Sequence, residues 1–257
     1  MNIRNTIFPL IQKAARCCGY SIKRRHPSIR RGGSHGTVNV SINNLMQAVH
    51  GENIYEAFDY HAYPNDPAGW GGDSPAFAEL IRETKPRFII EVGTWKGASA
   101  ITMANAMKSE GLDGRILCID TWLGAVEFWS DQSDPRRFLS LECKHGFPSV
   151  YYRFLANVCH AGQQQCIVPF PLPSSAAALW LMRTDLRADL IYVDASHEEE
   201  DVYQDLIDYG TLLTPEGKMC GDDWCWSGVR TAVERYAKEN NLAIRHLHNT
   251  WILERSR

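Results

Sequence analysis

Short apolar runs alternate with helical patterns from residue 87 onward. The predicted strands cover residues 87–92, 115–119, 166–168, 189–193 and 218–221. The predicted helices cover residues 97–109, 174–183, 199–212 and 228–239. A turn is expected at 213–217, and 242–245 and 250–253 are expected to close the sheet as an antiparallel pair. This alternation is typical of a parallel sheet with helices on both faces.

Two segments lie outside this alternation. Residues 52–75 are rich in Tyr, Pro, Asp and Gly, which is typical of a loop. Residues 121–163 are interpreted as an inserted segment that contains helices. Because neither 40–75 nor 121–163 carries a motif, we expect these stretches to decide the choice of substrate.

The beginning of the chain differs in charge from the rest. Residues 1–51 carry eight basic side chains and no acidic one, whereas the whole chain has a net charge of −3. Apolar residues recur at helical spacing from Ile3 to Ala14, although Pro9 interrupts the pattern. Two interpretations stay open: an amphipathic anchor for an anionic membrane surface or a partner, and a plain basic tail. We assign 1–50 as a basic N-terminal extension and 51–257 as the folded domain.

Composition narrows the class of protein. A chain of 257 residues with 44% apolar and 22% charged residues fits one globular α/β domain with an extension, not a disordered chain. The acidic net charge argues against nucleic-acid binding. Scattered cysteines and no recognisable secretory signal predict a reducing, cytoplasmic location, with peripheral membrane contact left open. A homo-oligomer is also left open.

The first candidate site follows the first predicted strand, in the stretch from Glu91 through Gly93, Thr94 and Gly97 to Ser99. Gly93 allows a tight turn and a close approach of ligand to backbone. Ser99, early in the next helix, is placed to hold a carboxylate together with the helix N-terminus. The spacing is not G-x-G-x-x-G, which counts against a dinucleotide dehydrogenase.

A second candidate is Asp120, directly after the second strand. A carboxylate at this point of a nucleotide-binding sheet accepts hydrogen bonds from a ribose diol. The alternative is an aspartate that only caps the next segment.

The third candidate is a cluster of acids at the ends of two later strands. Asp194 ends the fourth strand, and Asp222 and Asp223 end the fifth. Three carboxylates at one point repel each other unless a cation or protons neutralise them, and such oxygen ligands suit Mg²⁺. His197, three residues after Asp194, is expected near the same rim, formed by the carboxyl ends of these strands, where it would act as a general base. Helix capping by these aspartates is the alternative.

Together these motifs resemble the class I S-adenosylmethionine-dependent methyltransferases. More narrowly, they resemble the metal-dependent O-methyltransferases, which include catechol O-methyltransferase and enzymes that methylate sugars of macrolide and aminocoumarin antibiotics. The resemblance covers about residues 76–255. It implies a Rossmann-like, doubly wound α/β fold with a seven-stranded sheet whose last strand is antiparallel.

The resemblance also implies roles for single residues. The cofactor would be bound by Glu91, Gly93, Thr94, Gly97, Ser99 and Asp120. The Mg²⁺ ligands would be Asp194, Asp222 and Asp223. The catalytic base would be His197, where catechol enzymes carry Lys and some sugar enzymes His. The sequence departs from the family pattern at Trp95, where many members have Gly, and at Ser196, where some sugar-methylating relatives have Asp.

The leading interpretation is therefore a Mg²⁺-dependent O-methyltransferase that acts on a diol-bearing small molecule or glycan, most simply a sugar. A non-catalytic cofactor-binding scaffold on the same fold and a NAD-type oxidoreductase are the alternatives. Weaker features are several tryptophans near the expected rim, interpreted as core or as a substrate platform. These are Trp70, Trp122, Trp129, Trp224 and Trp226. The spacing of Cys143, His145, Cys159 and His160 fits no closed zinc site.

Overall fold

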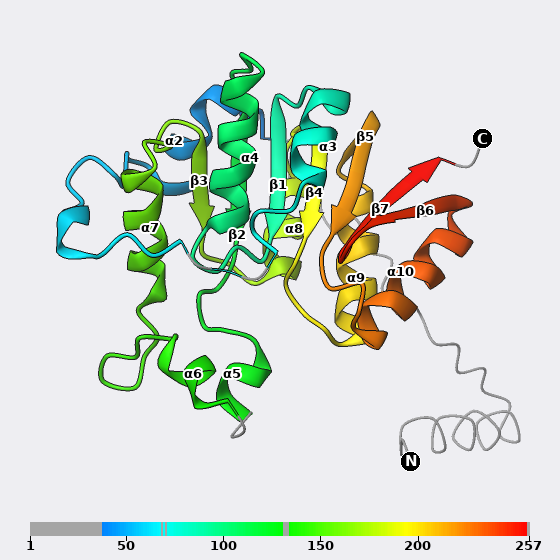
Figure 1. Ribbon diagram of the computed structural model, residues 1–257. Coiled ribbons are helices and arrows are strands. Elements are labelled where there is room, and N and C mark those ends of the chain that lie inside the picture. Colours follow the sequence, from blue (N-terminus) through cyan, green and yellow to red (C-terminus); the bar gives the residue numbers. More distant parts are fainter. Residues whose placement is uncertain (1–37, 68, 70, 131–133, 256–257) are drawn as a thin grey trace, which may run out of the picture. The chain divides into compact units, whose positions relative to one another are not determined.

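The computed structural model describes residues 38–67, 69, 71–130 and 134–255 (Figure 1). Most of the basic extension and Trp70 therefore lie outside the described residues, and the membrane contact stays a prediction. Within the described ranges, no helix has the length and apolar character needed to cross a bilayer.

One seven-stranded sheet forms the centre of the domain, in the order β3-β2-β1-β4-β5-β7-β6. The strands are β1 (Phe88–Val92), β2 (Arg115–Ile119), β3 (Ile167–Phe170), β4 (Ala188–Val193), β5 (Leu213–Gly221), β6 (Leu242–Leu247) and β7 (Thr250–Arg255). Strands β1 to β5 pair in parallel, and β7 runs antiparallel to both β5 and β6. The predicted fold class is confirmed.

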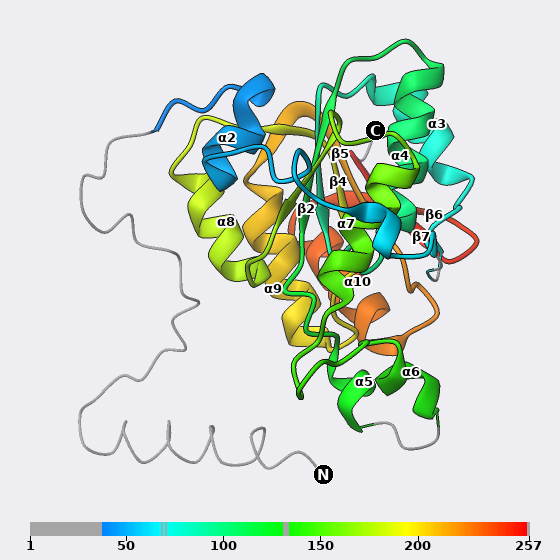
Figure 2. The same cartoon turned by 90° about the vertical axis from the view of Figure 1, so that its left-hand side faces the viewer.

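Helices cover both faces of this sheet (Figure 2). One face carries α3 (Ala76–Thr84), α4 (Ala98–Ser109) and α7 (Val150–His160). The other carries α2 (Leu45–His50), α8 (Ser174–Met182), α9 (Glu199–Gly210) and α10 (Ser227–Glu239). All five residues of β1 are buried, as expected for a parallel strand covered on both sides.

Alternate residues of β1 face opposite helix layers. Phe88, Ile90 and Val92 pack in the cluster that contains α8 and α9, whereas Ile89 packs with α3, α4 and α7. Because side chains alternate along a strand, Glu91 points to the same side as Ile89. This parity places a carboxylate beneath the first turn of α4.

Two expectations for the middle of the chain need correction. Residues 213–217 were expected to be a turn, but they belong to β5. Ala188 pairs with Leu213 and Leu190 pairs with Lys218, so extra residues bulge out of the pairing. The segment 121–163 is also not wholly an insertion. Its last helix, α7, is the crossover that covers the sheet between β2 and β3, and only α5 (Val126–Ser130) and α6 (Pro135–Leu139) project from the domain (Figure 1).

The described end of the expected extension packs on the sheet domain. Val38 bridges to Thr184, and Leu45 of α2 is fully buried. Nε2 of His50 donates to the Pro169 carbonyl of β3 at 2.8 Å. Residues 38–50 thus contribute to the core beside β3.

Candidate active site

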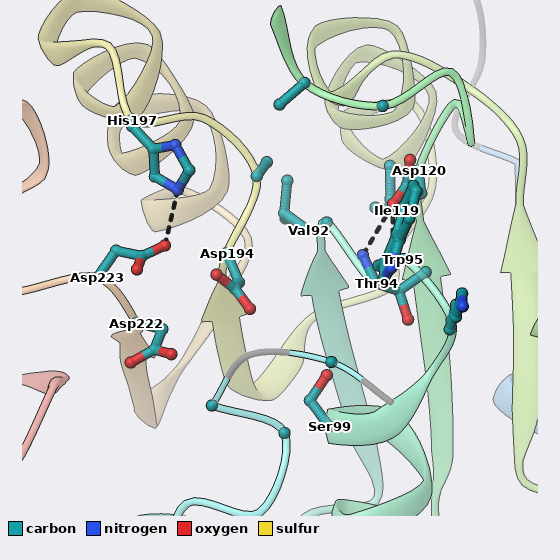
Figure 3. A pocket seen from close by; sticks show the side chains of 18 of the residues that line it. Val92, Thr94, Trp95, Ser99, Ile119, Asp120, Asp194, His197, Asp222 and Asp223 are labelled. Atoms are coloured by element: carbon teal, nitrogen blue, oxygen red, sulfur yellow. Dashed lines mark hydrogen bonds and ion pairs between the residues drawn. The ribbon is translucent and has the colours of Figure 1, made fainter. Parts of the chain in front are cut away.

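A cavity of about 590 Å³ lies at the carboxyl ends of the parallel strands. Its lining includes most of the predicted site residues, namely Gly93, Thr94, Ser99, Asp120, Asp194, His197, Asp222 and Asp223. In Figure 3 the three later aspartates and His197 lie on one side of the cavity, and Asp120 lies on the other. Glu91 and Gly97 are not part of the lining. Parallel strands end at one edge, which is why residues far apart in sequence meet here.

Gly93 closes the turn after β1 against the end of β4. Its φ is +81°, and a Cβ on it would lie 2.1 Å from the carbonyl oxygen of Asp194. Only glycine fits this approach without moving the end of β4. Gly97 has a different structural role from Gly93. It has a left-handed backbone conformation directly before α4 and lies against Phe154. Gly97 shapes the start of the helix and not the cavity wall.

Glu91 is fully buried behind the turn. Its carboxylate accepts hydrogen bonds from Thr94 Oγ1 at 2.7 Å, from Ser99 Oγ, and from Cys118 Sγ at 3.2 Å. Burial raises the pKa of Glu91 to about 7, and the hydroxyl donors from Ser99 and Thr94 partly offset that rise. Glu91 therefore braces the turn from below. The Ser99 hydroxyl is bonded to Glu91, so its predicted contact with a ligand carboxylate stays a prediction.

Asp120 holds the same turn from the side. Its Oδ2 accepts from the backbone N–H groups of Thr94 at 3.0 Å and Trp95 at 2.9 Å, and its Oδ1 accepts from Trp122 N–H at 2.7 Å. A carboxylate offers roughly four acceptor positions. Asp120 is thus both an anchor for the turn and a cavity-lining group with acceptor capacity left for a ligand.

Trp95 departs from the expected motif pattern, and the structure shows how it is tolerated. Its φ of +49° lies in the left-handed region, which disfavours a bulky side chain. The Asp120 carboxylate fixes the Trp95 N–H, and the Trp122 indole donates to the Trp95 carbonyl at 2.8 Å. Hydrogen bonds on both sides of the residue hold the strained conformation in place.

The carboxylates of Asp194, Asp222 and Asp223 form an acidic rim on the side of the cavity opposite Asp120 (Figure 3). Burial, followed by the charges of Asp223 and Asp222, raises the pKa of Asp194 well above its ordinary value. Burial and the Asp223 charge also raise the pKa of Asp222. Among the described residues, no three Asp, Glu, His or Cys side chains are grouped closely enough to hold a metal ion as they stand. The donor set nevertheless fits Mg²⁺ chemically, since a cation would relieve the repulsion between three oxygen donors.

His197 lies at the rim between two carboxylates. Its Nε2 is 2.9 Å from Asp223 Oδ2, and its Nδ1 is 3.2 Å from Glu127 Oε1. The ring stacks on the Trp226 indole, with centroids 4.3 Å apart and planes 11° from parallel. The Asp223 hydrogen bond raises the pKa of His197; burial opposes the rise and Glu127 adds to it. Glu127 was not predicted from the sequence, because it lies in 121–163, the segment without a motif.

Comparison with known proteins identifies the family. A family described as a methyltransferase domain matches residues 90–224, which is more than half of the chain and includes every predicted site residue from Glu91 to Asp223. The chain belongs to this methyltransferase family. The family predicted from the sequence motifs is therefore confirmed. A search of curated proteins gives no match to the sequence.

Solved structures share the fold of this methyltransferase at low sequence identity. An O-methyltransferase from Bacillus cereus in complex with SAH is 16% identical, with a TM-score of 0.51, covering 85% of this chain and 94% of that one. A putative O-methyltransferase from Klebsiella pneumoniae is 20% identical, with a TM-score of 0.51 and coverages of 84% and 96%. TomG from Streptomyces achromogenes, in complex with SAM, is 17% identical, with a TM-score of 0.51 and the same coverages.

A glycine-rich loop of the methyltransferase also borders the cavity, although the sequence of this loop matches no motif. Gly69, Gly71 and Gly72 are part of the lining. A Cβ on Gly71 would lie 1.9 Å from Asp222 Oδ2, and one on Gly72 would lie 2.4 Å from the Ala98 Cβ. The loop therefore passes between the acidic rim and the start of α4 (Figure 3). The run of glycines was the available signal for this close approach.

The same loop is fixed to the domain upstream of the glycines. Lys96 Nζ donates to Asp66 Oδ2 at 2.6 Å. Buried Asn157 accepts from the Asp66 N–H at 2.9 Å and donates to the carbonyls of Asp66 at 2.8 Å and Lys96 at 2.9 Å. These bonds join the loop to the turn after β1 and to α7.

The tryptophans divide between core and cavity. Trp122 is buried in the core, and Trp129 is exposed on α5. Trp224 stacks with His246, away from the lining. Trp226 lines the cavity, as do Trp95 and its packing partner Phe128. The cavity lining therefore includes the aromatic residues Trp95, Phe128 and Trp226. Phe128 was not singled out from the sequence.

Proposed function

We propose that this methyltransferase transfers a methyl group from S-adenosylmethionine to a hydroxyl of a diol-bearing acceptor, with Mg²⁺ as a second cofactor. The observation that carries the proposal is one cavity with Asp120 at one side and His197 with three aspartates at the other. Two of the structures that share the fold are O-methyltransferases bound to SAH or SAM.

The cofactor half of the cavity has the chemistry that a nucleoside and an amino acid require. Asp120 offers a carboxylate to a ribose diol, and Gly93 lets a ligand approach the backbone. Ser99 and the N-terminus of α4 line the cavity and would bind an α-carboxylate. When bound, S-adenosylmethionine supplies an electrophilic methyl group on a sulfonium.

Asp194, Asp222 and Asp223 are the residues that would hold Mg²⁺. When bound, the ion supplies a positive charge that lowers the pKa of an acceptor hydroxyl. Asp222 is buried and Asp194 is half-buried, so water shields their negative charge only in part. An acceptor with two adjacent hydroxyls suits such a rim, because both oxygens are hard donors.

His197 is the proposed general base. Its Nε2 faces the acidic side of the cavity, 2.9 Å from Asp223 Oδ2, and would take the proton of an acceptor hydroxyl bound there. Trp226 covers one face of the ring and limits access of water. Trp226 is 40% exposed, which leaves an apolar platform for a sugar ring or an aromatic ring. A sugar is preferred because His, and not Lys, occupies position 197.

Calorimetric titration of S-adenosylmethionine, with and without Mg²⁺, tests the proposal first. Wild type should bind, and Asp120→Asn should bind at least roughly tenfold more weakly, since a hydrogen bond to a charged group is worth about 1.5–3 kcal/mol. Asn is chosen over Ala because Ala would also release the N–H groups of Thr94 and Trp95. Asp113→Asn is the matched control, because Asp113 is exposed and bonded to Arg115. Absence of binding to wild type would overturn the proposal.

A further inference from the structure

The acidic rim depends on residues 222–226, the short segment that joins β5 to α10. Asp223 of this segment has a φ of +62°, in the left-handed region that is uncommon for residues other than glycine. Residues keep such a conformation only where the surrounding structure holds them in it. The bonds that hold the segment therefore decide where the Asp223 carboxylate lies.

These bonds come from the turn between β6 and β7 and from the start of β7. The backbone carbonyl of Asn249 accepts from the Trp224 N–H at 3.0 Å, and its Oδ1 accepts from the Cys225 N–H at 3.0 Å. The buried Trp251 indole donates to the Asp222 carbonyl at 2.9 Å. The antiparallel hairpin thus fixes the backbone of this segment at three points.

The side chain of Asn249 also reaches the rim, and it lines the cavity. Because its Oδ1 accepts from the Cys225 N–H, its Nδ2 is on the side of Asp223, where it donates to Asp223 Oδ1 at 3.4 Å. The same amide interacts with the Asp222 carboxylate. The other oxygen of Asp223, Oδ2, lies 2.9 Å from His197 Nε2. Asp223 is therefore held at both oxygens, which fixes the orientation of its carboxylate.

A carboxamide suits this role because it donates hydrogen bonds without carrying a charge. A lysine or arginine in the place of Asn249 would neutralise the rim and repel a cation. A carboxylate has roughly four acceptor positions, so the Asp223 oxygens keep positions for a metal ion beside these two contacts. Hydrogen-bond partners that do not touch the ion themselves orient the ligands of many metal sites.

We infer that Asn249 is a positioning residue of the acidic rim, whose amide holds the Asp223 carboxylate in place for a divalent cation. The inference rests on the proposed function, in which Asp194, Asp222 and Asp223 hold Mg²⁺. It gives the β6–β7 turn a definite task, since the turn supplies both the side-chain donor and the backbone acceptor that fix this part of the cavity.

The choice between Mg²⁺ and Ca²⁺ tests the inference. Mg²⁺ demands near-ideal octahedral geometry, whereas Ca²⁺ accepts a flexible set of oxygen ligands. A loosened Asp223 carboxylate should therefore weaken Mg²⁺ binding more than Ca²⁺ binding. Calorimetric titration of the full chain with each ion, in the presence of S-adenosylmethionine, gives both dissociation constants. In Asn249→Ala the Mg²⁺ affinity should fall by roughly 10–100-fold, and the Ca²⁺ affinity by less.

Asn249→Asp separates the side-chain donor from the backbone contacts. It keeps an oxygen for the Cys225 N–H and removes the N–H donor that faces Asp223. Its added charge changes the affinity for both ions, so the ratio of the two dissociation constants is the measurement. The preference for Mg²⁺ over Ca²⁺ should fall in this variant as it does in Asn249→Ala.

Asn240→Ala is the matched control, since Asn240 is exposed and its amide donates to the Tyr236 carbonyl at 2.8 Å, outside the cavity lining. This variant should keep both dissociation constants. S-adenosylmethionine titrated without a metal ion should bind wild type and all three variants alike, because Asp120 lies on the opposite side of the cavity. The same titration shows that each variant is folded.

The outcomes distinguish failure of this inference from failure of the proposed function. If wild type binds the ions and the ratio of the dissociation constants is unchanged in either folded Asn249 variant, the inference is overturned and the proposed function stands. If wild type binds S-adenosylmethionine but neither ion, the metal part of the proposed function is overturned, and the inference with it.

Discussion

The hydroxyl of Ser99, in the first turn of α4, donates a hydrogen bond to the buried carboxylate of Glu91 in β1. Thr94 donates to the same carboxylate at 2.7 Å, so Glu91 joins a strand, the turn that follows it and the next helix. The turn is thus built around a carboxylate that has no access to water. The turn lines the cavity, whereas Glu91 itself does not.

Glu91→Ala should therefore act on stability first. It would leave the hydroxyls of Thr94 and Ser99 without an acceptor, and a buried unsatisfied donor costs about 1–3 kcal/mol. Denaturant unfolding should show a loss of several kcal/mol. Ser99→Ala, which removes one donor and leaves the Thr94 bond intact, should cost clearly less. Equal losses in the two variants would show that Glu91 does not organise the turn.

Gly71→Ala should weaken Mg²⁺ binding while the domain still folds. The new Cβ would meet Asp222 Oδ2 at 1.9 Å and push that carboxylate away from the rim. Gly51→Ala is the matched control, because Gly51 also has a positive φ, of +74°, but has no atom within 4 Å of the added Cβ. Both variants should lose roughly 1 kcal/mol of stability from the backbone alone. Calorimetric Mg²⁺ titration should change for Gly71→Ala only, and equal titrations would contradict the prediction.

His197→Ala should abolish methyl transfer without loss of cofactor affinity. General-base catalysis contributes about 10²–10⁴-fold, so kcat on a diol acceptor should fall by a factor of about 10² or more. His246→Ala is a fair control, since His246 also stacks on a tryptophan, Trp224, with centroids 5.7 Å apart. Turnover assays and calorimetry on both variants provide the test. Full activity in His197→Ala would assign the base elsewhere.

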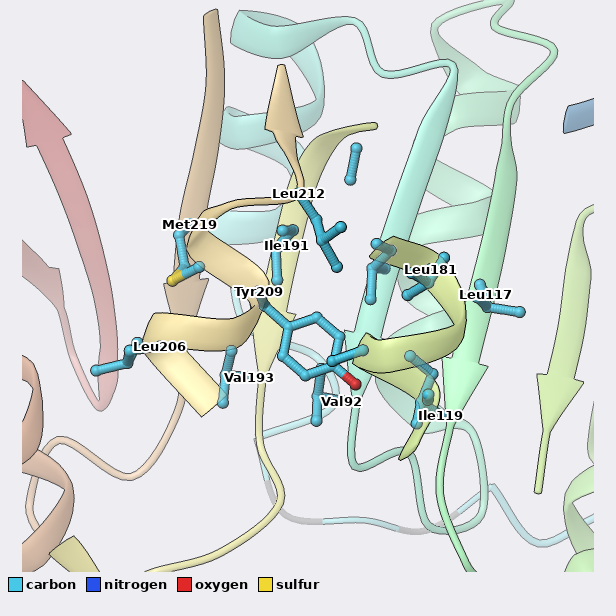
Figure 4. Close-up of a cluster of buried hydrophobic side chains, with 14 of the residues drawn as sticks. Val92, Leu117, Ile119, Leu181, Ile191, Val193, Leu206, Tyr209, Leu212 and Met219 are labelled. Atoms are coloured by element: carbon cyan, nitrogen blue, oxygen red, sulfur yellow. The ribbon is translucent and has the colours of Figure 1, made fainter. Parts of the chain in front are cut away.

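Asp205 should make stability depend on pH. It lies on α9, whose Leu206 and Tyr209 pack against the sheet (Figure 4). Burial raises the pKa of Asp205 to about 7, above the value of about 4 expected when unfolded. The folded state therefore holds the proton more tightly, and the free energy of unfolding should fall as pH rises from about 4 to about 7.

Asp205→Asn removes this titration. Relative to wild type, its stability should rise through that window by up to about 1.4 kcal/mol for each pH unit, and then level off. Urea unfolding at pH 5 and pH 8 measures the difference. Glu200→Gln changes an exposed carboxylate on the same helix that is not among the charges acting on Asp205, and it should not alter the pH profile. A difference between Asp205→Asn and wild type that is equal at both pH values would rule out the burial effect.

The local sequence was enough to predict the sheet, its helices and most of the cavity lining. Strand periodicity located β1, β2 and β4 to within a residue, and acids directly after strands must gather at one edge of a parallel sheet. Gly93 could be assigned because a tight turn after a strand requires it. These features depend on near neighbours in the chain, which a sequence displays directly.

Tertiary packing decided the rest. Strand parity turned Glu91 away from the cavity, and Asp120 took up the N–H groups of the turn. Glu127 reached His197 from a segment without a motif, and the loop at Gly71 came within contact of Asp222. Such contacts join residues that are far apart in the chain. They depend on the relative placement of whole elements, and no local spacing encodes that placement.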